Sequence, residues 1–190
     1  VHPEQQPDGT FRLADFVAPA PGSYFFYGDH RPTGAAPQVA RATVRVPGEP
    51  PLPLSRPPAT LPTTMTSGPF KVTLTSKAPL VAGADAVLQY TISEGDKPVT
   101  DLRNYLGALG HCVGIGLTTK DYLHSHPLGA SVDGRVDFHT IFPAPGTYRV
   151  WAEFRPRGEV LLINVDVTVA AAGAATPDAP AAHDHGPHAH

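Results

Sequence analysis

Two histidines separated by a single residue, His124 and His126, are the side chains of this sequence best suited to binding a metal ion. In a β-strand, side chains two positions apart point to the same side, so both imidazoles can approach one ion. Imidazole is a good ligand for copper, zinc and nickel. A third histidine, His111, precedes His124 by 13 residues, and an antiparallel hairpin through residues 117–121 would bring it beside His126. The pattern predicts a three-histidine site with a fourth position open to water or substrate.

A purely structural role for these histidines is the alternative. The pair His126-Pro127 recurs as His2-Pro3, and a residue before proline is pushed towards extended backbone. A histidine there can serve a turn by hydrogen bonding to its backbone. His111 shares a strand face with apolar residues at 113, 115 and 117, so it can equally close the edge of the core as a hydrogen-bonded polar group.

Two further residues could be ligands but fit other roles better. Cys112 is the only cysteine, so the chain cannot form an internal disulfide. Strand alternation turns Cys112 away from His111, which predicts a buried, unreactive cysteine. His139 alternates with Phe138, and we expect it at the surface.

The last eight residues, "HDHGPHAH", form a chelating tract. They follow an Ala/Pro/Gly-rich stretch that begins at Ala170, so residues 170–190 are predicted to be a disordered tail. The tail could wrap a copper, nickel or zinc ion as a secondary collector. Its expected ligands are His183, His185, His188 and His190.

The composition indicates a folded protein rich in turns. Hydrophobic residues make up 41% and charged residues 16%, which is enough apolar material for a core and too little charge for a disordered chain. The 23 prolines and 18 glycines lie between short apolar runs, which is typical of an all-β protein. The net charge of −3 argues against nucleic acid as a partner, and no apolar run is long enough to span a membrane.

An internal repeat divides the chain. Residues 2–46 and 126–169 share, in the same order, His-Pro, Asp-Gly, Pro-Ala-Pro-Gly-(Ser/Thr)-Tyr, Arg-Pro-x-Gly and a Val-rich closing strand. The second copy has a front half and the first has none. We therefore expect residues 1–46 to be the C-terminal half of a truncated first domain. Because the sequence starts at Val1, we also expect it to be processed or to be a fragment that has lost its targeting segment. The alternative is that residues 1–46 add strands to the complete domain.

Residues 47–68 are expected to link the two copies, since seven of the 16 residues from 47 to 62 are proline. Residues 69–169 then form a complete domain. Its alternating segments predict an immunoglobulin-like (cupredoxin-like) antiparallel β-sandwich, with the aromatic residues at 142, 148, 151 and 154 in the core. The seven expected strands are 71–76, 86–93, 111–117, 122–126, 136–142, 147–154 and 160–169.

Three motifs carry a family resemblance: "PVTDLRNYLGALGH" at 98–111, "YLHSHP" at 122–127 and "FPAPGTYRVW" at 142–151. The chain resembles the YtkA-like, heavy-metal-associated exported bacterial β-sandwich proteins and their tandem-domain relatives. The resemblance covers residues 69–169 and, as a half domain, 1–46. It implies a periplasmic or cell-surface location and the handling of copper or another soft metal. Cys112 departs from the pattern, which has an aliphatic residue there.

Two functions follow from these observations. One is an exported, non-catalytic metal-binding protein with a carrier or homeostasis role, most naturally for copper. The other is a structural or interaction module of tandem immunoglobulin-like domains whose partner is another exported or membrane protein. Motifs for nucleophilic, zinc-protease, phosphate-loop or dithiol chemistry are missing from the sequence, so we expect no enzyme.

Overall fold

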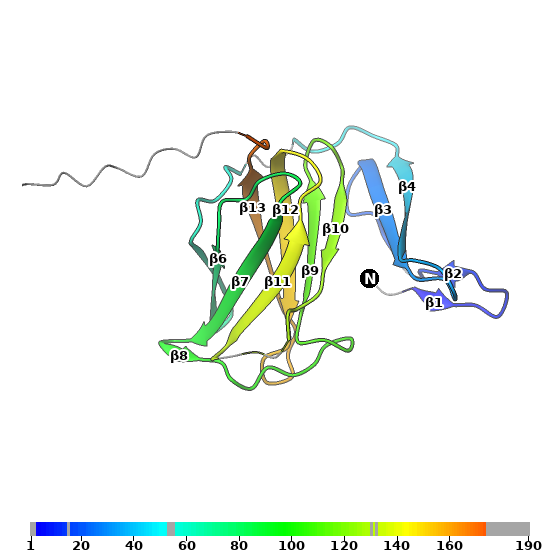
Figure 1. The fold of residues 1–190 in the computed structure, drawn as a ribbon. Helices are drawn as coiled ribbons and strands as arrows, with labels where there is room; N and C mark the ends of the chain where they lie inside the picture. Colours follow the sequence, from blue (N-terminus) through cyan, green and yellow to red (C-terminus); the bar gives the residue numbers. More distant parts are fainter. Residues whose placement is uncertain (1–2, 15, 53–55, 130, 132, 174–190) are drawn as a thin grey trace, which may run out of the picture. The chain divides into compact units, whose positions relative to one another are not determined.

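The computed structural model describes residues 3–14, 16–52, 56–129, 131 and 133–173. These residues form thirteen strands and divide into two compact units, Val1–Ser55 and Arg56–His190 (Figure 1). Unit 1 contains β1 (Glu4–Gln5), β2 (Phe11–Arg12), β3 (Gly22–His30) and β4 (Gln38–Val46). Unit 2 contains β5 (Thr63–Ser67), β6 (Phe70–Ser76), β7 (Asp85–Glu94), β8 (Lys97–Pro98), β9 (His111–Gly116), β10 (Tyr122–Ser125), β11 (Arg135–Ile141), β12 (Gly146–Phe154) and β13 (Leu161–Val169).

Unit 2 is the predicted antiparallel β-sandwich. One sheet has the strand order β10-β9-β12-β13, and the other has the order β11-β7-β6-β5, with β8 paired to β7. Figure 1 shows the two sheets facing each other, with the chain crossing between them after β8, β10 and β11. The crossings place β9 next to β12, so the strand that begins at His111 lies in the interior of its sheet.

The core lies between the sheets and follows the strand alternation. Along β6, β7, β11, β12 and β13 buried residues alternate with less buried ones, except at some strand ends, because successive side chains of a strand face opposite sides. The largest fully buried side chains are Tyr90, Tyr148, Phe138, Phe142, Phe154, Leu74, Leu88 and Ile92. All seven expected strands begin and end within one residue of those observed.

The side of β9 that faces the core is not the side that carries Val113 and Ile115. Cys112, Gly114 and Gly116 point into the core, whereas His111, Val113 and Ile115 lie half-buried on the outer face. Trp151 on β12 also lies half-buried on the outer face, so the prediction that it belongs to the core is wrong. Glycine is needed at two of these inner positions because neighbouring side chains fill the space: a Cβ at Gly116 would clash with the Thr119 hydroxyl, and one at Gly114 would stand 2.8 Å from Leu123 Cδ1.

The linker is shorter than predicted. Residues 63–67, inside the expected linker, form β5 and pair with β6 from Thr63–Leu74 to Ser67–Phe70. The run "TTMTS" is rich in β-branched residues and follows the last proline of the linker, so it can join a sheet edge.

A strap formed by residues 56–59 ties the end of the linker to β13. The Ala59 N–H donates to the Asp166 carbonyl at 2.7 Å, and Ala59 forms a parallel bridge with Val167. The Arg56 guanidinium donates to Asp166 Oδ1 at 2.9 Å, and Arg149 makes a two-bond contact with the same carboxylate at 2.7 and 2.9 Å. These donors lower the pKa of buried Asp166 to about 2, the Arg149 hydrogen bond being the largest cause.

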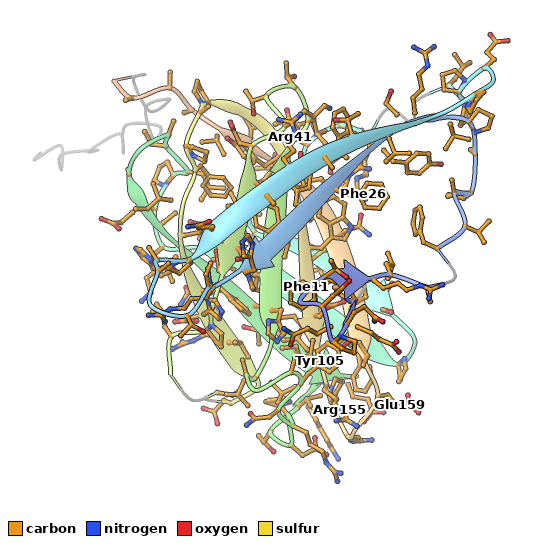
Figure 2. The ribbon with its side chains drawn as sticks, turned by 90° about the vertical axis from the view of Figure 1, so that its right-hand side faces the viewer. Phe11, Phe26, Arg41, Tyr105, Arg155 and Glu159 are labelled. Carbon is orange, nitrogen blue, oxygen red and sulfur yellow. The ribbon has the colours of Figure 1, made fainter. Side chains whose placement is uncertain are left out.

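Unit 1 has its own pairing. In the described residues, β1 pairs with β2 and β3 pairs with β4, and neither pair joins a sheet of the sandwich. The β3–β4 hairpin runs for nine residues on each strand, from Gly22–Val46 to His30–Gln38. Phe16 packs edge-on against Phe26 of β3, with ring centroids 5.3 Å apart. Figure 2 labels Phe26 on β3 and Arg41 on β4.

Candidate metal centre

The β9–β10 hairpin carries the three central histidines of the predicted site. The pairs run from Ile115–Tyr122 to Cys112–Ser125, so His111 and His126 come next, at the open end of the hairpin. A tight turn closes the other end: the Gly116 N–H donates to the Asp121 carbonyl and the Lys120 N–H to the Gly116 carbonyl, each at 2.9 Å. The predicted hairpin through residues 117–121 is therefore present.

Packing on the inner side of β10 fixes which way its histidines face. Leu123 and Ser125 are buried, with 7% and 3% of their surfaces exposed. Gly114, opposite Leu123, leaves room for that side chain, since a Cβ at Gly114 would stand 2.8 Å from Leu123 Cδ1. Because Leu123 and Ser125 point inward, His124 must point outward.

The three imidazole rings form a row on the outer face of the sheet. The ring centroids of His124 and His126 are 4.5 Å apart, and those of His111 and His124 are 6.0 Å apart. His111 and His124 are half-buried, and His126 is exposed. The structure thus brings together the three histidines of the hairpin, as a row in which His124 is central.

His111 is held from the loop that precedes β9. Its Nε2 lies 2.9 Å from the Tyr105 carbonyl, and the Tyr105 ring packs edge-on against the imidazole with centroids 6.0 Å apart. Figure 2 shows Tyr105 and Arg155 at the same end of the sandwich, where the Arg103 N–H donates to the Arg155 carbonyl at 3.0 Å. The loop is therefore attached both to the first histidine and to the connection after β12.

The row is a set of neighbouring imidazoles and not yet a coordination sphere. Among the residues that the structure describes, no three His, Cys, Asp or Glu side chains already surround one point as metal ligands do. What the row offers is imidazole nitrogens on the outer face of the sheet, next to Glu153, which pairs with His111.

The other predicted ligands lie apart from this row or outside the described residues. His139 is at the surface of the other sheet, as predicted, with Nε2 2.6 Å from Asp85 Oδ1. Cys112 is a free, fully buried cysteine, and burial raises the pKa of its thiol to about 12. Its sulfur is 3.8 Å from the Tyr90 hydroxyl, and its burial and raised pKa make it a poor nucleophile. The four tail histidines, His183, His185, His188 and His190, lie outside the described residues.

Two contributors to the site were not identified from the sequence. The Tyr105 carbonyl is a backbone group, and no residue type signals it. Glu153 could have been found, because the alternation of Tyr148, Val150 and Phe154 on the inner face of β12 places it outside, next to the strand of His111.

The sequence matches one family model. Residues 64–171 match the family described as "Domain of unknown function (DUF8832)". The chain belongs to this family. The match spans the sandwich of unit 2, including β9, β10 and their three histidines. None of the curated proteins matches the sequence.

Solved structures with some likeness include copper proteins. FetP of uropathogenic Escherichia coli strain F11, expressed in the periplasm, has 13% identity over 57% of this chain and 93% of its own, with a TM-score of 0.39. A copper-bound variant of FetP has 14% identity over 56% and 93%, also with a TM-score of 0.39. Copper-reconstituted P19 of Campylobacter jejuni has 9% identity over 56% and 92%, again at 0.39.

The predicted β-sandwich is confirmed by the sheets of unit 2 themselves. Membership of the YtkA-like group stays a prediction. Within the described residues, no helix has the length and apolar character needed to cross a membrane.

Proposed function

We propose that this chain is an exported, non-catalytic metal-binding protein that takes up copper through His111, His124 and His126 and serves as a carrier or in metal homeostasis. The observation that carries the proposal is the row of three imidazole rings, with centroid separations of 6.0 and 4.5 Å, on one outward sheet face. The tail histidines would act as a secondary collector.

Ligand chemistry supports copper over the alternatives. Nitrogen sites bind divalent first-row metals in an order that peaks at Cu²⁺, with nickel and zinc weaker. The site offers imidazoles near the surface and no thiolate, because Cys112 is buried on the opposite face of the sheet. A metal carrier also needs an accessible site from which the ion can leave, and the exposed His126 provides that access.

The binding experiment uses the full chain, with His183, His185, His188 and His190 replaced by alanine so that the tail does not bind the added metal. The readout is the fluorescence of Trp151, the only tryptophan. Trp151 pairs with Val113, which pairs with His124, so the indole lies two strand spacings, about 10 Å, from the central histidine. We expect one equivalent of Cu²⁺ to quench this fluorescence, with Ni²⁺ and Zn²⁺ competing for the same site.

The decisive comparison is His124→Ala against His139→Ala in that background. His139 is an exposed histidine on the other sheet, so its removal is a matched control. We expect His124→Ala to weaken copper binding by at least about tenfold, which is the lower end of the loss seen when even a residue behind a metal ligand is removed. His139→Ala should leave the copper affinity unchanged. Equal affinities in the two variants would overturn the proposal.

A second function has one observation in its favour. Unit 1 exposes large apolar side chains, three of them on β3 and β4 (Phe25, Val39 and Val44) and three before β3 (Phe11, Phe16 and Val17). Exposed apolar residues in this number are a feature of interaction modules. If the histidine row binds no metal, the alternative is a tandem β-sandwich module whose partner is another exported or membrane protein.

A further inference from the structure

The turn Tyr105-Leu106-Gly107-Ala108 presents a backbone carbonyl to His111. We infer that this turn is a positioning device that holds His111 with its proton on Nε2 and its lone pair on Nδ1. The inference deepens the proposed function and rests on it for the role of Nδ1 towards metal.

The hydrogen bond decides the tautomer. A carbonyl oxygen only accepts, so the 2.9 Å contact from Nε2 to the Tyr105 carbonyl requires the proton to be on Nε2. In a neutral imidazole the other nitrogen then carries the lone pair. A histidine that binds a metal usually donates its second ring N–H to a carbonyl or carboxylate, which orients the ring and makes the ligating nitrogen more basic. The Tyr105 carbonyl stands where such a partner is needed.

The turn is built to hold that carbonyl still. Tyr105 and Ala108 exchange two backbone hydrogen bonds, of 2.7 and 3.1 Å. Leu106 and Gly107 between them both have positive φ, at 50° and 87°, which are the values of a type I′ turn. The base of the loop is fixed as well, because Leu102 bridges Pro156 across the connection after β12.

Leu106 shows that the turn is kept at a conformational cost. A leucine at positive φ is disfavoured, and its side chain, 54% exposed, gains little from packing in return. Strain of this kind tends to occur where a backbone group is needed in a particular place. In this loop the group so placed is the Tyr105 carbonyl, which accepts the hydrogen bond from His111.

The first test needs no metal. Long-range proton–nitrogen NMR correlations on the ¹⁵N-labelled full chain report which ring nitrogen of each histidine carries the proton. We expect His111 to be protonated on Nε2. A finding of Nδ1 protonation, or of an even mixture, would overturn the inference whatever the metal does.

The second test breaks the turn with Gly107→Pro, since proline cannot adopt the φ of 87° at that position. Gly95→Pro, at another turn glycine with positive φ of 57° and open space around it, is the matched control. We expect Gly107→Pro to abolish the Nε2 preference of His111 and to weaken copper binding by about tenfold in the tail-substituted background, with Gly95→Pro doing neither. Leu106→Gly relieves the strain and keeps the turn, so it should preserve both the tautomer and the affinity.

The outcomes separate the two proposals. If the His111 tautomer depends on the turn but the protein binds no copper, the proposed function is wrong and the positioning role of Tyr105 is supported. Copper binding with a His111 tautomer that Gly107→Pro does not alter would sink the positioning role and leave the proposed function intact.

Discussion

The hairpins β3–β4 and β12–β13 share the motif Pro-Ala-Pro-Gly-(Ser/Thr)-Tyr at the start of their first strand and differ in what surrounds them. Both pair over nine residues per strand, from Gly22–Val46 in unit 1 and from Gly146–Val169 in unit 2. In both, the third residue of the first strand is a tyrosine whose hydroxyl bonds to the backbone four residues earlier. The Tyr24 hydroxyl accepts from the Ala20 N–H and donates to the Ala20 carbonyl, and the Tyr148 hydroxyl does the same with Ala144.

Burial separates the two hairpins. In unit 2, β12 also pairs with β9, and the second sheet covers the inner face. In unit 1, eight of the nine residues of β4 are exposed. The hairpin's own residues are therefore enough to set its strand register and its tyrosine contact. Burial of the hairpin in a core depends on strands that lie elsewhere in the sequence.

The outer faces also use different chemistry at equivalent positions. Arg149 and Asp166 form a cross-strand ion pair in unit 2, where unit 1 has the pair Phe25–Thr43. Arg41 instead lies over the Phe25 ring, 5.2 Å from its centroid. Acid should therefore act on the ion pair of unit 2, whereas Phe25 and Thr43 at the equivalent positions of unit 1 carry no carboxylate.

The largest difference is expected from one substitution made at equivalent positions. Val167 and Val44 occupy the same place in the two hairpins, with 1% and 50% of their surfaces exposed. Val167→Ala should lower the free energy of unfolding of unit 2 by about 2 kcal/mol, from lost burial and a residual cavity. Val44→Ala should leave that transition within about 0.5 kcal/mol of the parent protein. Urea unfolding followed by Trp151 fluorescence measures both, and equal losses would contradict the comparison.

Acid sharpens the comparison through Asp166. Its pKa is about 2 in the folded protein against an ordinary value of 3.8, because Arg149 and Arg56 bind the charged form. The stabilisation is complete above about pH 4 and is lost as the pH falls through the folded pKa. It amounts to about 2 kcal/mol. Unfolding of unit 2 between pH 5 and pH 2, compared with Asp166→Asn, isolates this contribution; a variant with the same acid sensitivity as the parent would count against it.

The tyrosine contact should give a smaller effect that is shared by both units. Tyr24→Phe and Tyr148→Phe each remove one hydroxyl and leave the alanine N–H and carbonyl without that partner. We expect a loss of about 1 kcal/mol for each, the usual net contribution of a hydrogen bond. Trp151 fluorescence measures unit 2, and amide hydrogen exchange in β3 and β4 measures unit 1. Unchanged exchange in Tyr24→Phe would show that the contact matters only inside a covered hairpin.

The smallest effect is expected at Ser125, between the two outward histidines. Its hydroxyl is buried and has no hydrogen-bond partner in the structure. Removing an unsatisfied buried polar group is neutral or stabilising, so Ser125→Ala should raise the free energy of unfolding by up to about 1 kcal/mol. The same urea experiment measures it, and a clear loss of stability would mean that the hydroxyl has a partner in solution.

The strands of unit 2 could be read from the sequence because alternation and turn residues are local signals. The hairpin that carries His111, His124 and His126 followed from the same signals. The inner face of β9 was not predicted, because Gly114 and Gly116 face inward where the side chains of Leu123 and Thr119 fill the space that a larger residue would need. Trp151 was misplaced for a related reason: its hydrophobicity suggested the core, while its parity with Glu153 placed it outside.

The strap at residues 56–59 has a consequence for association between molecules. β13 is the last strand of its sheet, and such an edge offers unpaired backbone groups to any other extended chain. The Ala59 N–H already donates a hydrogen bond to the Asp166 carbonyl, and Arg56 forms an ion pair with the Asp166 side chain. Proteolysis between the strap and β5 would therefore uncover a template for strand addition, so that a cut in the proline-rich segment would convert a well-behaved sandwich into an aggregation-prone one.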